Sequence, residues 1–427
     1  MMATFWVRLS HRSWPPVSRH SRDKDTLEAN SLSVAFVSSA AEIPNDLGTA
    51  GSPMPLEGPW LYKALEQSGL NAQFSFLYAI VRQGSKPIAA APAYAMDVLM
   101  ERVCPEKLLK TLKTIARVLP SVLHQRTLFV GSPGAAVSAI GILPGVNRRA
   151  VLFALQCALE RKARDLNAEL IIWRDMPGSV AKDLDWLTRR LRLFRAVSLP
   201  STVLRFSSER KRDYLEQLKP RWRRAYLRKL KRSASAVEVT TQVFQRPPRK
   251  VLDEMVGLFQ QTALKAKVKF EELPRAWFER IAEIETTYFM VMREKQTGEM
   301  IAATALFDRR PMLIARHVGI DYGKPRNWML YFRLWDALVD WALCQGFSSI
   351  LSGQASYTAK MEVGHDLIPL FNYIWHRNAF MHAVYGGVAQ RLTWAKLDDG
   401  LAKFLKAHPE AEEALESSES DDALVAF

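Results

Sequence analysis

Three polar side chains follow one another at three-residue intervals near the C-terminal end of the sequence: Gln354, Tyr357 and Lys360. On a helix this spacing would bring them to one side. A lysine there could stabilise a phosphate or a developing oxyanion, and a tyrosine could donate a hydrogen bond or a proton. The alternative is an amphipathic helix that turns its polar side to solvent, and the spacing alone favours that alternative.

A second group of candidate residues interrupts the apolar segment 312–320, which has the composition of a strand. Arg316 is a candidate for binding an anionic substrate or donor. The imidazole of His317 titrates near neutral pH, which makes it a candidate general base. A histidine inside an apolar strand is more often a hydrogen-bonded core residue, and His365 is similarly ambiguous.

A basic segment in the middle of the chain predicts a helix that a proline opens. Trp222, Tyr226 and Leu230 recur at four-residue spacing and would form an apolar stripe. The remaining surface is cationic, with Arg221, Arg223, Arg224, Arg228, Lys229, Lys231 and Arg232. Arg221 and Arg224 are candidate substrate- or donor-binding residues. Contact with RNA or an anionic sugar-nucleotide, and a packed helix ringed by solvated cations, explain this pattern equally well.

The overall composition agrees with a basic intracellular protein. The formal net charge is +15 and the isoelectric point is near 9.7, which favours nucleic acid, anionic lipid surfaces or phosphorylated substrates as partners. Three widely separated cysteines form neither a disulfide framework nor a metal-binding spacing, so we expect a reducing compartment and no metal. No apolar run is long enough for a transmembrane helix, and we predict a cytoplasmic location.

Two blocks of the sequence recur in the same order. An apolar strand, a polar turn and a strand containing Ile-Ala-Ala occupy 78–94 and again 288–307. A helix and a short apolar strand occupy 147–173 and, without a gap, 327–353. The asparagine at the start of each helical segment can cap its N-terminus. Because two separate blocks repeat, an internal duplication is favoured over coincidence.

The duplication predicts an α/β chain of two related domains. We expect a disordered leader (1–55), an N-terminal domain (56–200), a basic helical linker (201–240), a C-terminal domain (241–396) and a mostly disordered acidic tail (397–427). The leader is arginine- and serine-rich near its start and weakly resembles a transit peptide. The tail carries seven acidic residues and no basic residue from Glu410 onward.

The C-terminal block resembles the FemAB-like branch of the GNAT acyltransferase superfamily. In that branch a strand after the long helix leads into a Tyr-x-x-Lys segment, then a glycine, then a strand with a proline. The matching residues are Tyr357, Lys360, Gly364 and Pro369. The basic segment is similar to the Arg-Arg-x-x-Arg-Lys helix of the family, and the resemblance covers roughly residues 57–395.

The resemblance implies two tandem GNAT-like domains, each a mixed, mostly antiparallel sheet flanked by helices and joined by a basic helical hinge. It implies transfer of an acyl or aminoacyl group from a thioester or an aminoacyl-tRNA to an amine acceptor. The site would lie in the C-terminal half, with Tyr357, Lys360 and His317 as catalytic candidates and Gln354 and Arg316 at the substrate. The alternative is a non-catalytic GNAT-like protein that binds nucleic acid or an anionic surface.

One departure from the family concerns the donor. Relatives that use acetyl-CoA carry a glycine-rich loop before the long helix, whose backbone N–H groups hold the pyrophosphate. The segment 319–330 has glycines at that place, but not at the family's spacing. Lys324 and Arg326 could instead hold a phosphate through their side chains. An acyl-CoA donor therefore stays open.

Overall fold

The computed structural model describes residues 24–44, 47, 58–99, 109–110, 113–114, 116–117, 120–265 and 272–417. The arginine-rich start of the predicted leader lies outside these residues. None of the helices in the described ranges combines the length and the apolar composition that crossing a bilayer requires.

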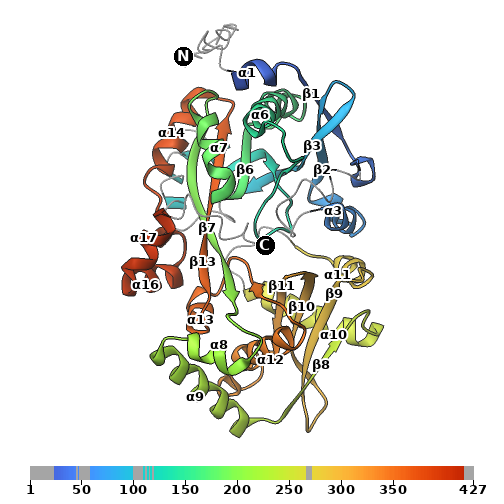
Figure 1. Cartoon of the computed structure of the whole chain (residues 1–427), viewed down its shortest axis with the longest axis vertical. Coiled ribbons are helices and arrows are strands. Elements are labelled where there is room, and N and C mark those ends of the chain that lie inside the picture. Colours follow the sequence, from blue (N-terminus) through green and yellow to red (C-terminus); the bar gives the residue numbers. More distant parts are fainter. Residues whose placement is uncertain are drawn as a thin grey trace, which may run out of the picture.

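The strands form one sheet of 13 members that runs through both halves of the chain (Figure 1). From one edge to the other the order is β1 (Leu32–Val37), β2 (Ser75–Gln83), β3 (Lys86–Leu99), β4 (His124–Val130), β6 (Leu170–Pro177), β13 (Asp366–His376), β7 (Phe194–Arg205), β12 (Ser349–Leu351), β11 (Met312–Ile320), β10 (Met300–Arg309), β9 (Thr287–Glu294) and β8 (Val239–Phe244). The short strand β5 (Gly141–Ile142) pairs with β3 outside this path. The sheet is mixed and mostly antiparallel, as the resemblance implied, but the two halves share one continuous sheet and do not have one each.

The strand order is symmetric about its centre. In the N-terminal half (β1 to β7), β1 to β4 follow one another from one edge of the sheet toward its centre, and in the C-terminal half (β8 to β13), β8 to β11 do the same from the other edge. The last strand of each half is exchanged: β13 pairs antiparallel with β6, and β7 pairs antiparallel with β12. The two exchanged strands pair with each other over most of their length. This arrangement confirms the internal duplication that the repeated blocks predicted.

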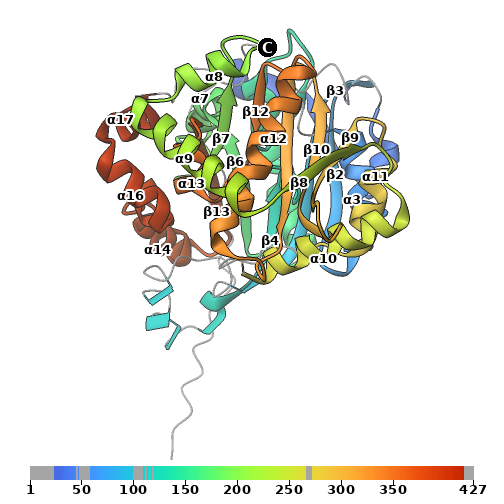
Figure 2. The ribbon, with the colours of Figure 1, turned by 90° about the horizontal axis from the view of Figure 1, so that it is seen from below.

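One face of the sheet is covered by α3 (Pro59–Glu66), α10 (Arg249–Lys265) and α11 (Arg275–Ala282). Leu61 of α3 and Trp277 of α11 belong to the same apolar core, and α3 lies beside α11 (Figures 1 and 2). Because this core draws side chains from both halves, neither half buries its apolar surface alone.

The opposite face carries the long helix of each half, α6 (Arg148–Asp165) and α12 (Leu330–Cys344). The alternation along the strands explains how both faces are buried. Tyr78 belongs to the core under α3, whereas its neighbour Ala79 belongs to the core under α6. Successive side chains of a strand point to opposite faces, so a two-sided sheet needs apolar residues at nearly every position.

The remaining helices of the described residues pack against the central strands β13 and β7 or against other helices. They are α1 (Lys24–Ala29), α7 (Gly178–Thr188), α8 (Lys211–Gln217), α9 (Pro220–Ala236), α13 (Tyr357–Glu362), α14 (Ala379–Ala389), α15 (Trp394–Leu397), α16 (Asp399–Ala407) and α17 (Pro409–Ser417). Pro220 opens α9 as predicted. The hydroxyl of buried Tyr226 on α9 donates to Asp336 on α12 at 2.9 Å, which fastens α9 to the C-terminal half. That α9 acts as a hinge stays a prediction.

The predicted disorder at both ends is wrong for the described residues. Within the expected leader, β1 pairs antiparallel with β2 and forms an edge of the sheet. Within the expected tail, α16 and α17 bury Leu401, Leu405 and Leu415. The acidic composition of the tail concealed these few leucines, whose helical spacing gives α16 and α17 an apolar side.

Of the two asparagines predicted as helix caps, only one caps its helix. The side chain of Asn147 accepts a hydrogen bond from the amide of Ala150 at 3.2 Å and so caps α6. Asn327 lies in a short 3-10 turn, η4 (Arg326–Trp328), and α12 begins only at Leu330 without a side-chain cap. The predicted domain boundaries stay a prediction. The boundary after residue 200 would fall inside β7.

Gly319 sets how closely α10 approaches β11. A Cβ atom at this position would lie 2.8 Å from the Cβ of Leu258 and 2.9 Å from its backbone carbonyl carbon. We expect Gly319→Ala to lower the free energy of unfolding by roughly 1–3 kcal/mol, because the helix backbone must move away from the strand. Urea denaturation of the full chain measures this change.

Gly257→Ala on the same helix is the matched control. A Cβ atom at Gly257 meets no heavy atom within 4 Å, so this change should be neutral or stabilise the helix by up to about 1 kcal/mol. Equal effects of the two substitutions would contradict the tight contact between α10 and β11.

Candidate functional site

The two parallel strands of the C-terminal half separate after only three residue pairs. β11 and β12 pair at Met312–Ser349, Leu313–Ile350 and Ile314–Leu351. Beyond this point β11 continues along β10, whereas the chain after Leu351 turns at Gly353, which has φ +68°. The polar candidates from both strands therefore come directly after the last shared pair. We call this point the β11–β12 split.

The corresponding split in the N-terminal half is closed. β4 and β6 pair up to Val130 and Trp173, and every residue of the following segment 131–140 is buried. A Cβ atom at Gly131 would lie 2.3 Å from Oγ of Ser138, so the segment folds tightly onto itself. The N-terminal half therefore has no exposed polar residues directly after β4 that would correspond to the polar candidates of the C-terminal half.

Lys360 is buried beside the split. Its ammonium group donates to the carbonyl oxygens of Ser352 and Gly353 at 2.6 and 3.0 Å. Burial, and to a smaller extent the charge of Arg316, lower the pKa of Lys360 to about 7. The amine is therefore divided between its charged and neutral forms near neutral pH, and Arg316 lies close enough to influence it.

Tyr357 and Gln354 fasten the chain after β12 to β7. The hydroxyl of Tyr357 donates to the carbonyl of Pro200 at 2.7 Å, and the amide of Gln354 donates to that of Leu199 at 2.9 Å. Tyr357 is almost completely buried, which raises its pKa. The expected common helix side is wrong for Gln354, because α13 begins only at Tyr357, and the alternative of a solvent-exposed side is wrong because Tyr357 and Lys360 are buried. The catalytic role of Tyr357 and the substrate contact of Gln354 stay predictions.

His317 lies apart from these residues. It occupies a bulge with φ +57°, where β11 has one residue more than β10. The indole N–H of Trp277 donates to Nε2 of His317 at 3.2 Å, and the rings of Phe259 and Phe278 lie against the imidazole. Burial and then Arg316 lower the pKa of His317 to about 3. Its acceptor nitrogen is occupied, so the geometry offers the predicted general base no support.

Three residues at the split escaped the sequence analysis as site residues. Nε2 of His365 lies 2.7 Å from Oγ of Ser352, and Nδ1 lies 3.0 Å from the carbonyl oxygen of Lys360. Oγ1 of Thr202 lies 3.1 Å from the same serine oxygen and donates to the carbonyl of Gly353 at 2.7 Å. Thr202 and Ser352 are 150 residues apart and become neighbours only through the strand exchange. No local signal connects them.

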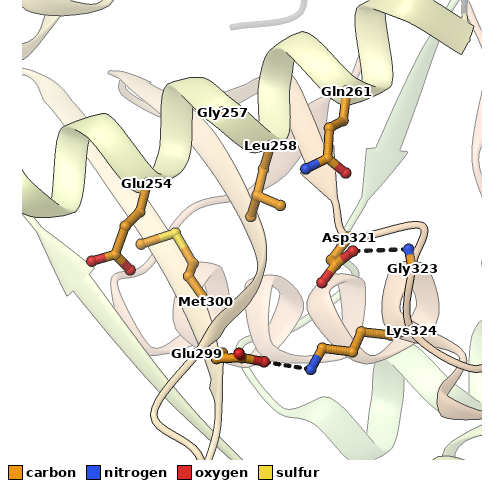
Figure 3. A pocket seen from close by; sticks show the side chains of 9 residues that line it. All are labelled: Glu254, Gly257, Leu258, Gln261, Glu299, Met300, Asp321, Gly323 and Lys324. Carbon is orange, nitrogen blue, oxygen red and sulfur yellow. Dashed lines mark hydrogen bonds and ion pairs between the residues drawn. The ribbon is translucent and has the colours of Figure 1, made fainter.

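Lys324 is held in a different place, at the far end of β11. Its ammonium group pairs with Glu299 at 2.6 Å and Glu294 at 3.2 Å, and these bonds raise its pKa. Figure 3 shows this lysine pointing toward Glu299. It lines a hollow of about 590 Å³, which we call the acidic pocket, together with Glu254, Gly257, Leu258, Gln261, Glu299, Met300, Asp321 and Gly323.

The loop before α12 does not fit a pyrophosphate. The amide of Gly323 already donates to the side chain of Asp321 at 2.8 Å, and the amides of Trp328 and Met329 donate within the turn η4. The adjacent acidic pocket would repel a phosphate, and Lys324 is neutralised by its carboxylate partners. Arg326 is exposed on η4. The loop before α12 therefore lacks the free backbone N–H groups that usually hold the pyrophosphate of coenzyme A.

The predicted cationic side of α9 faces solvent. Arg221, Arg224, Arg228, Lys231 and Arg232 are all exposed, and we call them the cationic face. Within the described ranges none of these five has an ion pair or hydrogen bond through its side chain. Lys229, in contrast, pairs with Glu362 and lies over the ring of Phe332. The cationic face is therefore available to a polyanion.

Cysteine and metal chemistry have little support in the described part of the chain. No three side chains of His, Cys, Asp or Glu there converge as metal ligands. Cys157 and Cys344 are free thiols, and burial raises the pKa of Cys157 to about 11, which keeps it protonated. Cys104 lies outside the described residues.

Comparison with known proteins identifies the fold. No family model and no curated protein sequence matches the chain. The solved structure of FemX matches with a TM-score of 0.54 and 9% sequence identity, over 83% of this chain and 100% of FemX. The chain has the FemAB-like fold of two tandem GNAT-like domains.

Two further solved structures are similar to this chain, and the first of them supports the fold. A conserved protein of unknown function from Bacteroides thetaiotaomicron matches with a TM-score of 0.50 and 10% identity, over 80% of this chain and 99% of that one. A tandem GNAT protein from the clavulanic acid biosynthesis pathway matches with a TM-score of 0.46 and 10% identity, over 81% and 99%. At such identities the likeness concerns the fold alone.

The lowered pKa of Lys360 predicts a pH-dependent stability. Lysines of the unfolded chain titrate near 10.5, so between about pH 7 and pH 10 the unfolded chain binds more protons than the folded chain. The contribution of this residue to stability therefore rises with pH. From pH 7 to pH 9.5 we expect the wild type to gain up to about 3 kcal/mol relative to Lys360→Met. Urea denaturation at both pH values measures the gain, and a flat or falling difference would contradict the lowered pKa.

Proposed function

We propose that this protein is an N-acyltransferase that moves an acyl or aminoacyl group to an amine at the β11–β12 split. The observation that carries the proposal is the buried Lys360 beside Arg316 at this split, in a chain that matches FemX over the whole length of FemX. Acyl transfer needs positive charge where an oxyanion develops and a group that accepts the proton of the attacking amine. The two side chains provide one of each.

Arg316 is the permanent cation of this pair, because a guanidinium does not lose its proton in a protein. We assign it to the oxyanion that forms on the donor carbonyl. Lys360 has a pKa near 7, the range in which a general base is most effective. We assign it to the proton that the acceptor amine gives up. Tyr357 and Gln354 hold the loop between these groups and β7 in place.

The residues favour a charged tRNA as the donor over an acyl-CoA. The GNAT fold as such is compatible with acyl-CoA, but the loop before α12 here has its amides occupied and carboxylates beside it. The cationic face of α9 offers unpaired charge at a spacing that follows one side of a helix. Phosphate contacts of this kind supply most of the affinity for RNA.

Substitution of either charged residue at the split should abolish transfer without unfolding the chain. We expect Lys360→Met and Arg316→Gln each to lower kcat at least about 100-fold, as loss of one oxyanion or proton-transfer group commonly does. The matched control is Lys295→Met, which removes an exposed lysine paired only with Glu238. Transfer of radiolabel from charged tRNA to amine acceptors measures the rates. Full activity of both site variants would place the chemistry elsewhere.

The cationic face should govern affinity for RNA. We expect replacement of Arg221, Arg224 and Arg228 by alanine to weaken binding of tRNA and to flatten its logarithmic salt dependence by roughly 2–3 units, about one per lost phosphate contact. A fluorescence titration at several salt concentrations measures both quantities.

The control for this experiment removes the same charge from other surfaces. Arg212, Arg280 and Lys295 are each paired with a carboxylate, to Glu216, Glu283 and Glu238 respectively. Their combined replacement by alanine should leave the salt dependence nearly unchanged. Equal losses in both triple variants would mean that RNA senses only the net charge of the protein.

The cationic face also supports a second candidate function, a non-catalytic protein that binds nucleic acid or an anionic surface. This alternative predicts the same salt dependence but no turnover with any donor. It further predicts that Lys360→Met and Arg316→Gln leave the function intact, so the two site variants separate the two proposals.

A further inference from the structure

Ser352 and His365 form a hydrogen-bonded pair whose polarity can be assigned. A carbonyl oxygen only accepts hydrogen bonds, so Nδ1 of His365, 3.0 Å from the carbonyl of Lys360, must carry the ring proton. Nε2 is then an acceptor, and the hydroxyl of Ser352 at 2.7 Å is its donor. Burial and the charge of Lys360 lower the pKa of His365 to about 3, which keeps the imidazole neutral. A neutral Nε2 can take the serine proton.

Ser352, His365 and the backbone carbonyl of Lys360 together have the arrangement of an activated nucleophile. Ser352 supplies the hydroxyl, His365 the base, and the carbonyl of Lys360 orients the ring. The ring of Trp335 lies 4.7 Å from that of His365 and limits its rotation. Nucleophile, base and orienting group within hydrogen-bond reach of one another are the recurring arrangement of covalent acyl transfer.

The fold does not require a hydroxyl at this position. In the gapless alignment of the two duplicated segments, Ser352 corresponds to Ile172 of the N-terminal half. Ile172 is an apolar residue of β6 that pairs with Phe129 of β4 and packs against the core. A purely structural role would be met by an apolar side chain, as it is there.

The surroundings of Ser352 suit an acyl carbonyl. The residue is only half-buried, and it follows directly after the last pair that β12 shares with β11. The loop that carries it is already held by Lys360, which donates to its carbonyl, and by the bond from Thr202 to Gly353. The hydroxyl of Ser352 is therefore not needed to fix the loop.

We propose that Ser352 is the nucleophile of a two-step acyl transfer, with His365 as its base. This deepens the proposed function and rests on it. In the first step Oγ of Ser352 bonds to the acyl carbon, its proton passes to Nε2 of His365, and the leaving oxygen of the donor departs with that proton. In the second step the acceptor, which has given its ammonium proton to Lys360, bonds as a neutral amine to the acyl carbon, the bond to Oγ breaks, and a second amine proton returns to Oγ through His365.

A fluorophosphonate probe tests the nucleophile without knowledge of the donor. The full-length protein is incubated with the probe and analysed by intact mass and peptide mapping. We expect one adduct on Ser352 in the wild type, none in Ser352→Ala, and labelling at least about 100-fold slower in His365→Asn, where the base is lost. Ser356→Ala is the matched control, because this exposed serine lies in the same loop and should leave labelling unchanged.

Ser352→Cys guards against loss of folding, since a thiol keeps the nucleophile and should be acylated as a thioester. No adduct on Ser352 in a folded wild type, or equal labelling of Ser352→Ala, would overturn the proposal. The transfer assay with charged tRNA distinguishes failure of the serine step from failure of the proposed function. If Ser352→Ala transfers at the wild-type rate, attack is direct and only the serine step fails. If the wild type labels at Ser352 but transfers nothing, the nucleophile stands and the proposed function fails.

Discussion

The antiparallel pairing of β7 with β13 is the interaction on which the rest of the structure depends. Each of these strands closes the sheet of the opposite half, so the two halves form one sheet and both contribute side chains to its apolar cores. The same exchange brings the carbonyls of Leu199 and Pro200 under Gln354 and Tyr357, and Thr202 beside Ser352. The site is thus assembled from both halves, although its charged residues come from the second.

Duplication followed by divergence explains why only one split is suited to chemistry. In the N-terminal half the segment after β4 is fully buried. In the alignment of the duplicated segments, Ile172 and Trp173 of this half stand at the last two positions. In the C-terminal half these positions hold Ser352 and Gly353, and the positive φ of Gly353 lets the chain turn away from β11. The carboxylates of the acidic pocket at the end of β11, and the unpaired cations of α9, divide the same half into a surface that repels phosphate and one that attracts it.

Much of this architecture is readable in the sequence, because alternation and helical spacing are local properties. The hairpins at Gly84 and Gly298, the cap at Asn147 and the helix at Pro220 were all predictable. Partners far apart in sequence were not. The spacing from Tyr357 makes Lys360 a candidate, but its lowered pKa follows from burial and from the charge of Arg316. Composition also misled where a few leucines, such as Leu415, anchor an acidic segment.

The position of the donor carbonyl tests the account most directly. A crystal structure of the full chain with an amide-linked aminoacyl-adenosine, a stable analogue of the 3′ end of charged tRNA, would locate it. We predict that the acyl carbonyl lies at the β11–β12 split, within hydrogen-bonding distance of Arg316 and next to Oγ of Ser352. An acyl group bound in the acidic pocket, or anywhere away from the split, would contradict the account.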